Sequence, residues 1–175
     1  ALPYEGTVLE HLLIQHLTSF YDVGEHNHIR LRGADWNDGL DMAEERGESV
    51  AFTALYGGNL KNLAQDIKAY SDKTGKDTVS IAKEILVLLE ADSSIYDSIG
   101  EKNALLEKYC DEVGHIISGE KTEVKCDWLA DKLTEMSNWI TDHIRNTEWT
   151  SDKEGNSWFN GYYDNSGKAV EGDFE

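Results

Sequence analysis

The sequence Arg32-Gly33-Ala34-Asp35-Trp36-Asn37-Asp38-Gly39 lies between two segments of helical periodicity and belongs to neither. It places two carboxylates, an indole and an amide between two glycines, directly after a guanidinium, a mixture that a hydrophobic core does not use. In a sugar pocket, a flat indole faces the apolar side of a pyranose while polar groups hydrogen-bond its hydroxyls. The same residues also fit a simpler interpretation, with Asn37-Asp38-Gly39 as a turn and Asp35 as a cap.

Apolar residues at helical spacing on both sides of this stretch predict a mainly helical chain. Thr7 and Glu10 fit a capping box, and the helix that follows them is expected to end at Gly24. Ser49 is expected to cap a second long helix. The pair Gly57-Gly58 weakens that helix, so it predicts either a break or a close contact with another helix.

Further helices and one hairpin are expected downstream. The helices are predicted over residues 78–92, 101–118 and 122–147, and a change in composition after them indicates a β-hairpin over 157–171. Residues 25–47 are irregular and polar, which makes them the expected functional loop.

The charge balance limits the classes of partner. Sixteen basic residues against 34 acidic ones give a formal net charge of −18. Such a surface repels nucleic acids and anionic membranes, so neither is an expected partner, whereas a neutral oligosaccharide suits it. The two cysteines, Cys110 and Cys126, are expected to be reduced thiols, and no apolar run is long enough to span a bilayer. We therefore expect a cytoplasmic protein.

The stretch Gly33-Ala34-Asp35-Trp36-Asn37-Asp38-Gly39-Leu40, followed by Arg46-Gly47-Glu48-Ser49-Val50, resembles glycoside hydrolase family 94. This family comprises inverting phosphorylases of β-linked glucose disaccharides and oligosaccharides, such as cellobiose. Thr7-Val8-Leu9-Glu10-His11-Leu12-Leu13 is similar to the helix that precedes the motif in the family. Trp158-Phe159 and Tyr163-Asp164-Asn165-Ser166-Gly167 are similar to the hairpin that follows it. The resemblance is dense near the N-terminus and returns near the C-terminus.

The resemblance implies an α/α barrel of six helical hairpins, of which residues 1–175 would form one segment. Residues 75–120 then form an additional helical insertion, because the family commonly has a short connection there. Asn160-Gly161 stands where the family commonly has an arginine. Because of the insertion and the missing arginine, the resemblance does not identify the specific substrate. We expect the chain to be a fragment of a larger enzyme, inactive by itself, whose full-length form is open to homodimerisation.

The resemblance implies a hexosyltransferase reaction in which phosphate cleaves a β-glucoside to α-glucose 1-phosphate. It assigns the proton donor to Asp38 and the donor-sugar site to Trp36, with Asp35 and Arg32 as further substrate-binding residues. Inorganic phosphate is the co-substrate, and neither a metal nor an organic cofactor is expected. Phosphate is already anionic, so one carboxylic acid suffices where an inverting hydrolase needs two.

Several residues have competing interpretations. Arg32 can orient a carboxylate of the loop or contact substrate, and the structural role is favoured. Glu48-Ser49 is interpreted as a helix start rather than as a ligand. The histidines of His26-Asn27-His28 lack a diagnostic metal-ligand spacing. The aromatic residues of the C-terminal hairpin, which include Trp158 and Phe159, could form a carbohydrate platform, although packing within the hairpin is the commoner role.

Two alternative functions stay open. One is an inverting glycoside hydrolase of similar architecture, which would need a second catalytic carboxylate and no phosphate. The other is a non-catalytic acidic helical module whose Asp-rich loop binds calcium or another protein, although the spacing of the loop does not match an EF-hand.

Overall fold

The computed structural model describes residues 4–32, 43–114 and 117–170. Five α-helices, two 3₁₀ helices and seven short strands lie in these ranges, so the prediction of a mainly helical chain is confirmed. In chain order, they are α1 Val8–Tyr21, β1 Ile29–Arg30, β2 Glu48–Ser49, α2 Val50–Thr74, β3 Thr78–Ala82, η2 Lys83–Ile85, α3 Leu86–Leu89, η3 Ser93–Ile95, α4 Ile99–Val113, β4 Lys121–Lys125, α5 Cys126–Thr147, β5 Trp149–Ser151, β6 Ser157–Phe159 and β7 Tyr162–Tyr163.

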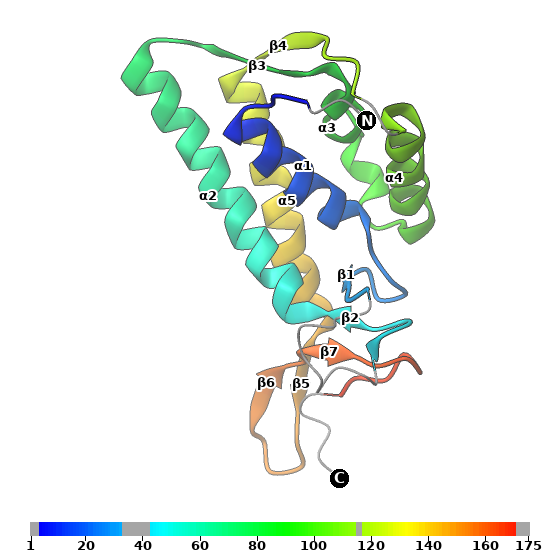
Figure 1. Ribbon diagram of the computed structural model, residues 1–175. Coiled ribbons are helices and arrows are strands. Elements are labelled where there is room, and N and C mark those ends of the chain that lie inside the picture. Colours follow the sequence, from blue (N-terminus) through cyan, green and yellow to red (C-terminus); the bar gives the residue numbers. More distant parts are fainter. Residues whose placement is uncertain (1–3, 33–42, 115–116, 171–175) are drawn as a thin grey trace.

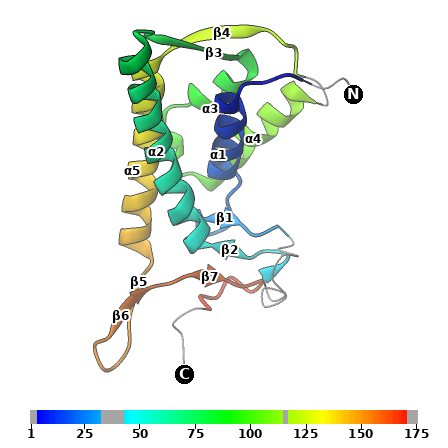
Figure 2. The ribbon, with the colours of Figure 1, turned by 60° about the vertical axis from the view of Figure 1, so that its left-hand side comes forward.

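The long helices α2 and α5 lie side by side, and the other elements are arranged around them (Figure 1). Helix α1 packs across them, and α3 and α4 lie beyond α1. The sheet β1–β2–β7 lies below the helices, and the β5–β6 hairpin projects farther from them (Figure 2). One hydrophobic core joins the helices, because buried leucines and isoleucines of α1, α2, α3 and α5 form a single cluster. None of the helices in the described ranges combines the length and apolar character that crossing a bilayer requires.

Both expected helix caps are confirmed. The Thr7 hydroxyl accepts the Glu10 backbone N–H at 3.2 Å, and the Glu10 carboxylate accepts the Thr7 N–H at 2.6 Å. Helix α1 ends at Tyr21, three residues before Gly24. The Ser49 hydroxyl caps α2 by accepting the Phe52 N–H at 3.0 Å.

Helix α2 is continuous through Gly57-Gly58, so the predicted break is absent and the predicted helix contact is present. A Cβ atom built on Gly57 would lie 2.8 Å from Cγ2 of Ile140 on α5, whereas one on Gly58 would meet nothing within 4 Å. The Ser137 hydroxyl of α5 also donates to the Gly57 carbonyl at 2.7 Å. Gly57 therefore allows α5 to approach the backbone of α2.

The helices expected over 78–92 and 122–147 were partly wrong, because each begins with a strand. Strands β3 and β4 pair antiparallel over five residues each, with Val79 opposite Val124. Ile81 and Val124 are buried in the paired strands, so strand pairing prevails over the expected helical spacing here. The helix expected over 101–118 corresponds to α4.

Strand β3 is attached to α1 through a buried carboxylate. The Ala82 N–H donates to Glu10 at 2.7 Å, and Lys121 of β4 forms an ion pair with the same carboxylate. Burial alone would raise the pKa of Glu10, but the hydrogen bonds from Lys121, Thr7 and Tyr4 lower it to about 2. Glu10 is therefore ionised at neutral pH.

The C-terminal β-structure begins earlier than the expected 157–171. Strands β5 and β6 form a hairpin in which Trp149 faces Phe159, and β7 leaves that hairpin to pair with β2. The following turn closes through a bridge between Tyr163 and Ala169. The C-terminal segment thus joins the N-terminal half of the molecule.

The two glycines of α2 provide a matched test of the helix contact. We expect Gly58→Ala to raise the free energy of unfolding by about 1 kcal/mol, because alanine favours the helix and meets open space. Gly57→Ala should lower it by about 1–2 kcal/mol, because the new methyl group overpacks against Ile140. Urea denaturation measures both, and equal effects of the two variants would contradict the contact.

Candidate functional site

The proposed proton donor Asp38 and the proposed sugar-binding residues Asp35 and Trp36 lie outside the described residues, but both ends of the segment that carries them are described. Strands β1 and β2 flank this segment and pair with each other, with Arg30 opposite Glu48. The Leu31 N–H also donates to the carbonyl of Gly47 at 3.0 Å. Residues 31 and 47, at the two ends of this segment (the loop), are therefore held next to each other beside strands β1 and β2.

Arg32 lies at the start of this loop and binds a carboxylate. Its guanidinium donates to Asp22, just after α1, through Nε at 2.9 Å and Nη2 at 2.6 Å. These hydrogen bonds raise the pKa of Arg32, and its backbone φ of 49° is left-handed. Among the described residues, the partner of Arg32 is thus an acid outside the loop, and 61% of the arginine side chain stays exposed.

The far end of the loop is fixed by an asparagine of the C-terminal segment. The side-chain oxygen of Asn165 accepts the N–H groups of Glu45 and Arg46 at 2.8 and 2.9 Å. Arg46 in turn donates to Glu25 through two nitrogens, with contacts between 2.6 and 3.0 Å. Segments far apart in the sequence therefore meet at this end of the loop.

Glu48 is a buried carboxyl group that holds the segment before β1. It accepts the backbone N–H groups of His26 and His28 at 3.0–3.1 Å, and it contacts Nδ1 of His26 at 2.7 Å. A Cβ atom on Gly24 would lie 2.4 Å from the Glu48 carboxyl carbon, so only glycine fits there. The helix-start interpretation is confirmed for Ser49, whereas Glu48 lies in β2 and acts as an internal acceptor.

Glu148 is a second buried carboxylate, at the end of α5, and sequence reasoning missed it. It accepts hydrogen bonds from His28 Nε2 at 2.8 Å, the Tyr163 hydroxyl at 2.9 Å, Asn160 Nδ2 at 3.1 Å and the Thr147 hydroxyl at 2.9 Å. Burial would raise the pKa of Glu148, but the hydrogen bonds from His28, Asn160 and Thr147 lower it to about 2. Glu148 therefore carries a negative charge inside the protein and connects the segment before β1 to β7.

Rings stack against the same segment. His26 lies parallel to Tyr163, with ring centroids 3.6 Å apart, and the His26 carbonyl contacts Nε2 of His143 at 3.0 Å. Trp139 stacks on His143 at 4.9 Å. Burial lowers the pKa of His143, and burial together with Glu148 raises that of Tyr163. The two stacks, linked by the contact between the His26 carbonyl and His143, extend from β7 to the middle of α5.

Lys102 of α4 supports the segment from inside the core. Its ammonium nitrogen lies 4.1 Å from the Phe20 ring centroid and 4.3 Å from that of Trp139, and it donates to Asn27 Oδ1 at 2.9 Å. Asn27 has a left-handed φ of 63° and donates to the Tyr96 carbonyl. Burial lowers the pKa of Lys102 to about 7.

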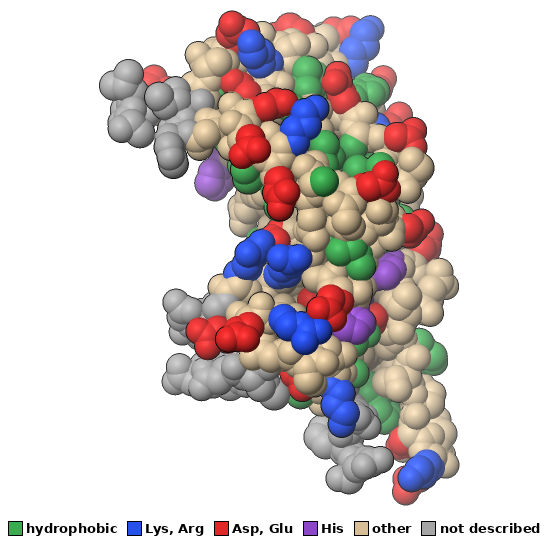
Figure 3. All heavy atoms as spheres, turned by 90° about the vertical axis from the view of Figure 1, so that its right-hand side faces the viewer, with side chains coloured by type: hydrophobic (Ala, Val, Ile, Leu, Met, Phe, Trp, Pro, Cys, Tyr) green, Lys and Arg blue, Asp and Glu red, His purple; other side chains and the backbone are tan. Residues whose placement is uncertain are grey.

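The buried groups hold the segments at the two ends of the loop, and exposed charges lie beside those ends. Three of the four arginines in the chain, Arg30, Arg32 and Arg46, lie at its two ends, beside Asp22 and Glu25. Figure 3 shows Lys and Arg side chains gathered with acidic ones on this face, in the lower half of the molecule. Among the described residues, no group of three or more His, Cys, Asp or Glu side chains could hold a metal ion.

Comparison with protein-family models gives no match for this chain, and a search among curated proteins gives none either. The resemblance to glycoside hydrolase family 94 therefore rests on the quoted motifs.

Glu148→Gln tests the role of the buried carboxylate. We expect it to lower the free energy of unfolding at pH 7 by about 2–4 kcal/mol, because the amide is a weaker acceptor for His28 and Tyr163. The pKa of Glu148 is depressed in the folded state, so its contribution is complete above pH 4.5 and is lost as pH falls toward 2. Chemical denaturation at several pH values should show a shallower acid dependence in the variant.

Glu154→Gln is the matched control, because this residue lies exposed in the turn between β5 and β6. It should change neither the stability at pH 7 nor the acid dependence. The same pH profile for Glu148→Gln as for Glu154→Gln would contradict the buried-charge role of Glu148.

Proposed function

We propose that this chain is part of an inverting sugar phosphorylase that cleaves β-glucosides with inorganic phosphate to give α-glucose 1-phosphate. The proposal includes an α/α-barrel architecture similar to glycoside hydrolase family 94 and a cytoplasmic location. One structural observation supports it above all. The two ends of the segment that carries Asp35, Trp36 and Asp38 are held together by the paired strands β1 and β2, and catalytic groups need such support from rigid elements.

In the proposed reaction, Asp38 delivers a proton to the glycosidic oxygen as the bond from that oxygen to the anomeric carbon breaks. A phosphate oxygen forms the new bond from the opposite face, so the configuration inverts. Trp36 would provide the apolar wall of the donor-sugar site, and Asp35 would accept hydrogen bonds from sugar hydroxyls. Arg32 would hold the entry of the loop through Asp22 and reach substrate with its exposed side.

An acid catalyst at neutral pH needs a raised pKa, since an ordinary aspartic acid titrates near 3.9. A neighbouring carboxylate and burial beneath a sugar both raise the pKa of an acid. In the proposal, the neighbouring carboxylate is Asp35. The phosphate site is assigned to residues outside this chain, because Arg32 and Arg46 already bind carboxylates.

The full-length protein provides the test. We expect it to release inorganic phosphate from α-glucose 1-phosphate when a suitable glucose or β-gluco-oligosaccharide acceptor is present. Asp38→Asn should reduce that rate by about 10²–10⁴-fold, because the general acid is lost. Asp41→Asn is the matched control, an acid of the same loop without an assigned role, and it should retain most of the activity.

A folded protein that releases no phosphate with any acceptor would contradict the proposal. Sugar release from oligosaccharides without phosphate would instead favour an inverting hydrolase. Calcium-dependent thermal stabilisation, with neither activity, would favour the non-catalytic module.

A further inference from the structure

An apolar groove lies beside strand β3, at the opposite end of α2 from strands β1 and β2 (Figure 2). Its volume is about 730 Å³, and it is bounded by the first turns of α1, the second half of α2 and the beginning of β3. Leu12, Ile67 and Val79 line it, one from each element. Val8 also lines it and is 77% exposed, and exposed apolar surface of this kind marks an interaction site.

Strand β3 has one edge that β4 does not cover. At the two ends of the β3–β4 ladder, the Cys126 N–H donates to the Asp77 carbonyl at 2.8 Å, and the Lys83 N–H donates to the Glu120 carbonyl at 3.0 Å. Hydrogen-bonded and non-hydrogen-bonded pairs alternate along an antiparallel ladder. The odd-numbered residues of β3 therefore bond to β4, whereas the even-numbered residues direct their backbone groups away from it.

These outward backbone groups belong to Thr78, Ser80 and Ala82. The Ala82 N–H confirms their direction, because it donates to Glu10 of α1 at 2.7 Å. Thr78 and Ser80 line the groove, and no hydrogen bond within the described residues uses their outward N–H and C=O groups. Strand β3 thus presents two donors and two acceptors along the groove.

The complement of such an edge is an extended chain. Another strand supplies matching N–H and C=O groups at alternate residues, whereas a helix has already used its own backbone groups internally. In a strand added antiparallel to β3, the residue opposite Val79 has its side chain on the same sheet face as Val79 and Val124. That face is the buried one, because Val124 is only 6% exposed. The middle residue of the added strand is therefore apolar.

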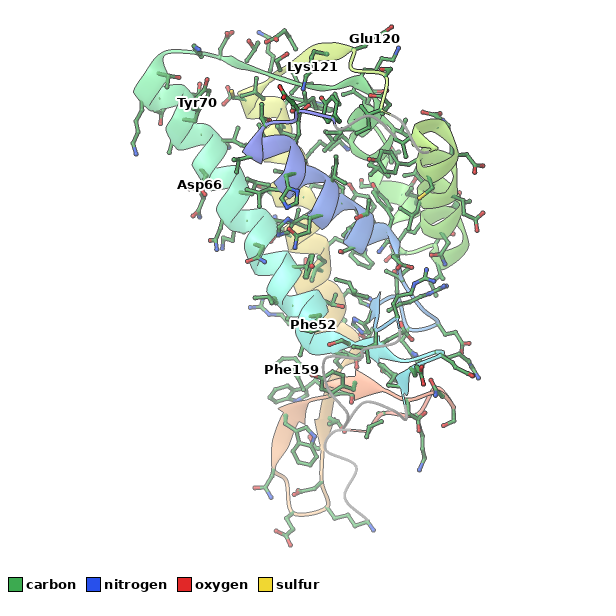
Figure 4. All side chains as sticks on the ribbon, in the orientation of Figure 1. Phe52, Asp66, Tyr70, Glu120, Lys121 and Phe159 are labelled. Atoms are coloured by element: carbon green, nitrogen blue, oxygen red, sulfur yellow. The ribbon has the colours of Figure 1, made fainter. Side chains whose placement is uncertain are left out.

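The charges at the groove favour basic residues on both sides of that apolar one. Ser80 is opposite Glu123, so the neighbours of the apolar residue share a sheet face with the Glu123 carboxylate. Glu123 and Asp66 line the groove and form no ion pair within the described chain, and Figure 4 labels Asp66 and Tyr70 on α2. Lys76 is the one basic side chain among the described residues that line it. A second copy of this chain is disfavoured, because each copy carries a net charge of −18.

We propose that this groove binds an extended segment of a partner protein, which pairs with β3 as an additional strand. The segment carries an apolar residue between two lysines or arginines. The apolar side chain enters the groove beside Val79, the basic ones extend toward Glu123 and Asp66, and the backbone pairs with Thr78 and Ser80. The inference does not depend on the sugar chemistry of the loop.

The probe is the peptide acetyl-Thr-Lys-Leu-Lys-Thr-amide, and the measurement is amide hydrogen exchange followed by NMR. In the free chain, the amides of Thr78 and Ser80 should exchange quickly, whereas those of Val79 and Ile81 are already protected by β4. We expect saturable binding of the peptide to slow the exchange of Thr78 and Ser80. The same peptide with both lysine backbone nitrogens methylated should bind about tenfold or more weakly, because it keeps the charge and loses the two donors.

Ser80→Pro and Ser80→Ala form a matched pair in the chain itself. Proline removes an outward N–H at a sheet edge and leaves the bonds to β4 in place, so we expect binding to weaken by about three- to tenfold. Alanine keeps that N–H and should bind like the unchanged chain. A peptide with glutamates in place of the lysines should bind at least about threefold more weakly.

The tests with the methylated peptide use the unchanged chain, so they do not depend on the folding of Ser80→Pro. Equal binding of the methylated and unmethylated peptides would overturn the proposal. So would saturation by the peptide without slower exchange at Thr78 and Ser80. A chain that dimerises without peptide, with these two amides already protected, would overturn the partner assignment in favour of a second copy.

Discussion

The hydrogen bond between His28 and Glu148 is the interaction on which the arrangement of the site depends. It joins the segment before β1 to the end of α5, across 120 residues, and both side chains are fully enclosed. A carboxylate at this depth is tolerated only when donors surround it, and Glu148 has them from His28, Asn160, Tyr163 and Thr147. Glu48 is likewise a buried acid surrounded by donors, because it accepts the backbone N–H groups of His26 and His28, and it lies in β2 at the end of the loop. Two buried acids thus connect the segments in this part of the molecule, beside a small apolar cluster around Leu31 and Ala43.

This construction explains why the loop is flanked by glycines and strained residues. The backbone must pass close enough to Glu48 for two N–H groups to reach it, which excludes a side chain at Gly24. Asn27 and Arg32 adopt left-handed backbone conformations, and both are held by side-chain hydrogen bonds. Local strain of this kind persists where the surroundings over-determine it, and it is frequent beside functional loops.

The helices were accessible from sequence because their signals are local. The capping box at Thr7, the cap at Ser49 and the spacing of apolar residues all act within a few positions. Strands β3 and β4 were assigned to helices because each is only five residues long and its partner is distant in the sequence. Helices α3 and α4 lie between the two strands along the chain. The buried carboxylates were missed for a similar reason, since nothing near Glu148 in the sequence indicates that its partner is His28. Alternation in Thr78-Val79-Ser80-Ile81 was the one local signal that could have identified a strand.

The pairing of β2 with β7 also determines when, during synthesis of the chain, the loop can gain its support. Glu48 and Ser49 pair with Tyr163 and Tyr162, so the support of the loop uses residues that lie far apart in the sequence. A ribosome adding about 5–20 residues per second needs roughly 6–23 seconds to proceed from Glu48 to Tyr163. During that interval, the nascent chain can form α1 and α2, but it lacks Glu148 and β7. The loop therefore acquires its support only late in synthesis, so it is the part of the molecule that a chaperone would have to protect longest.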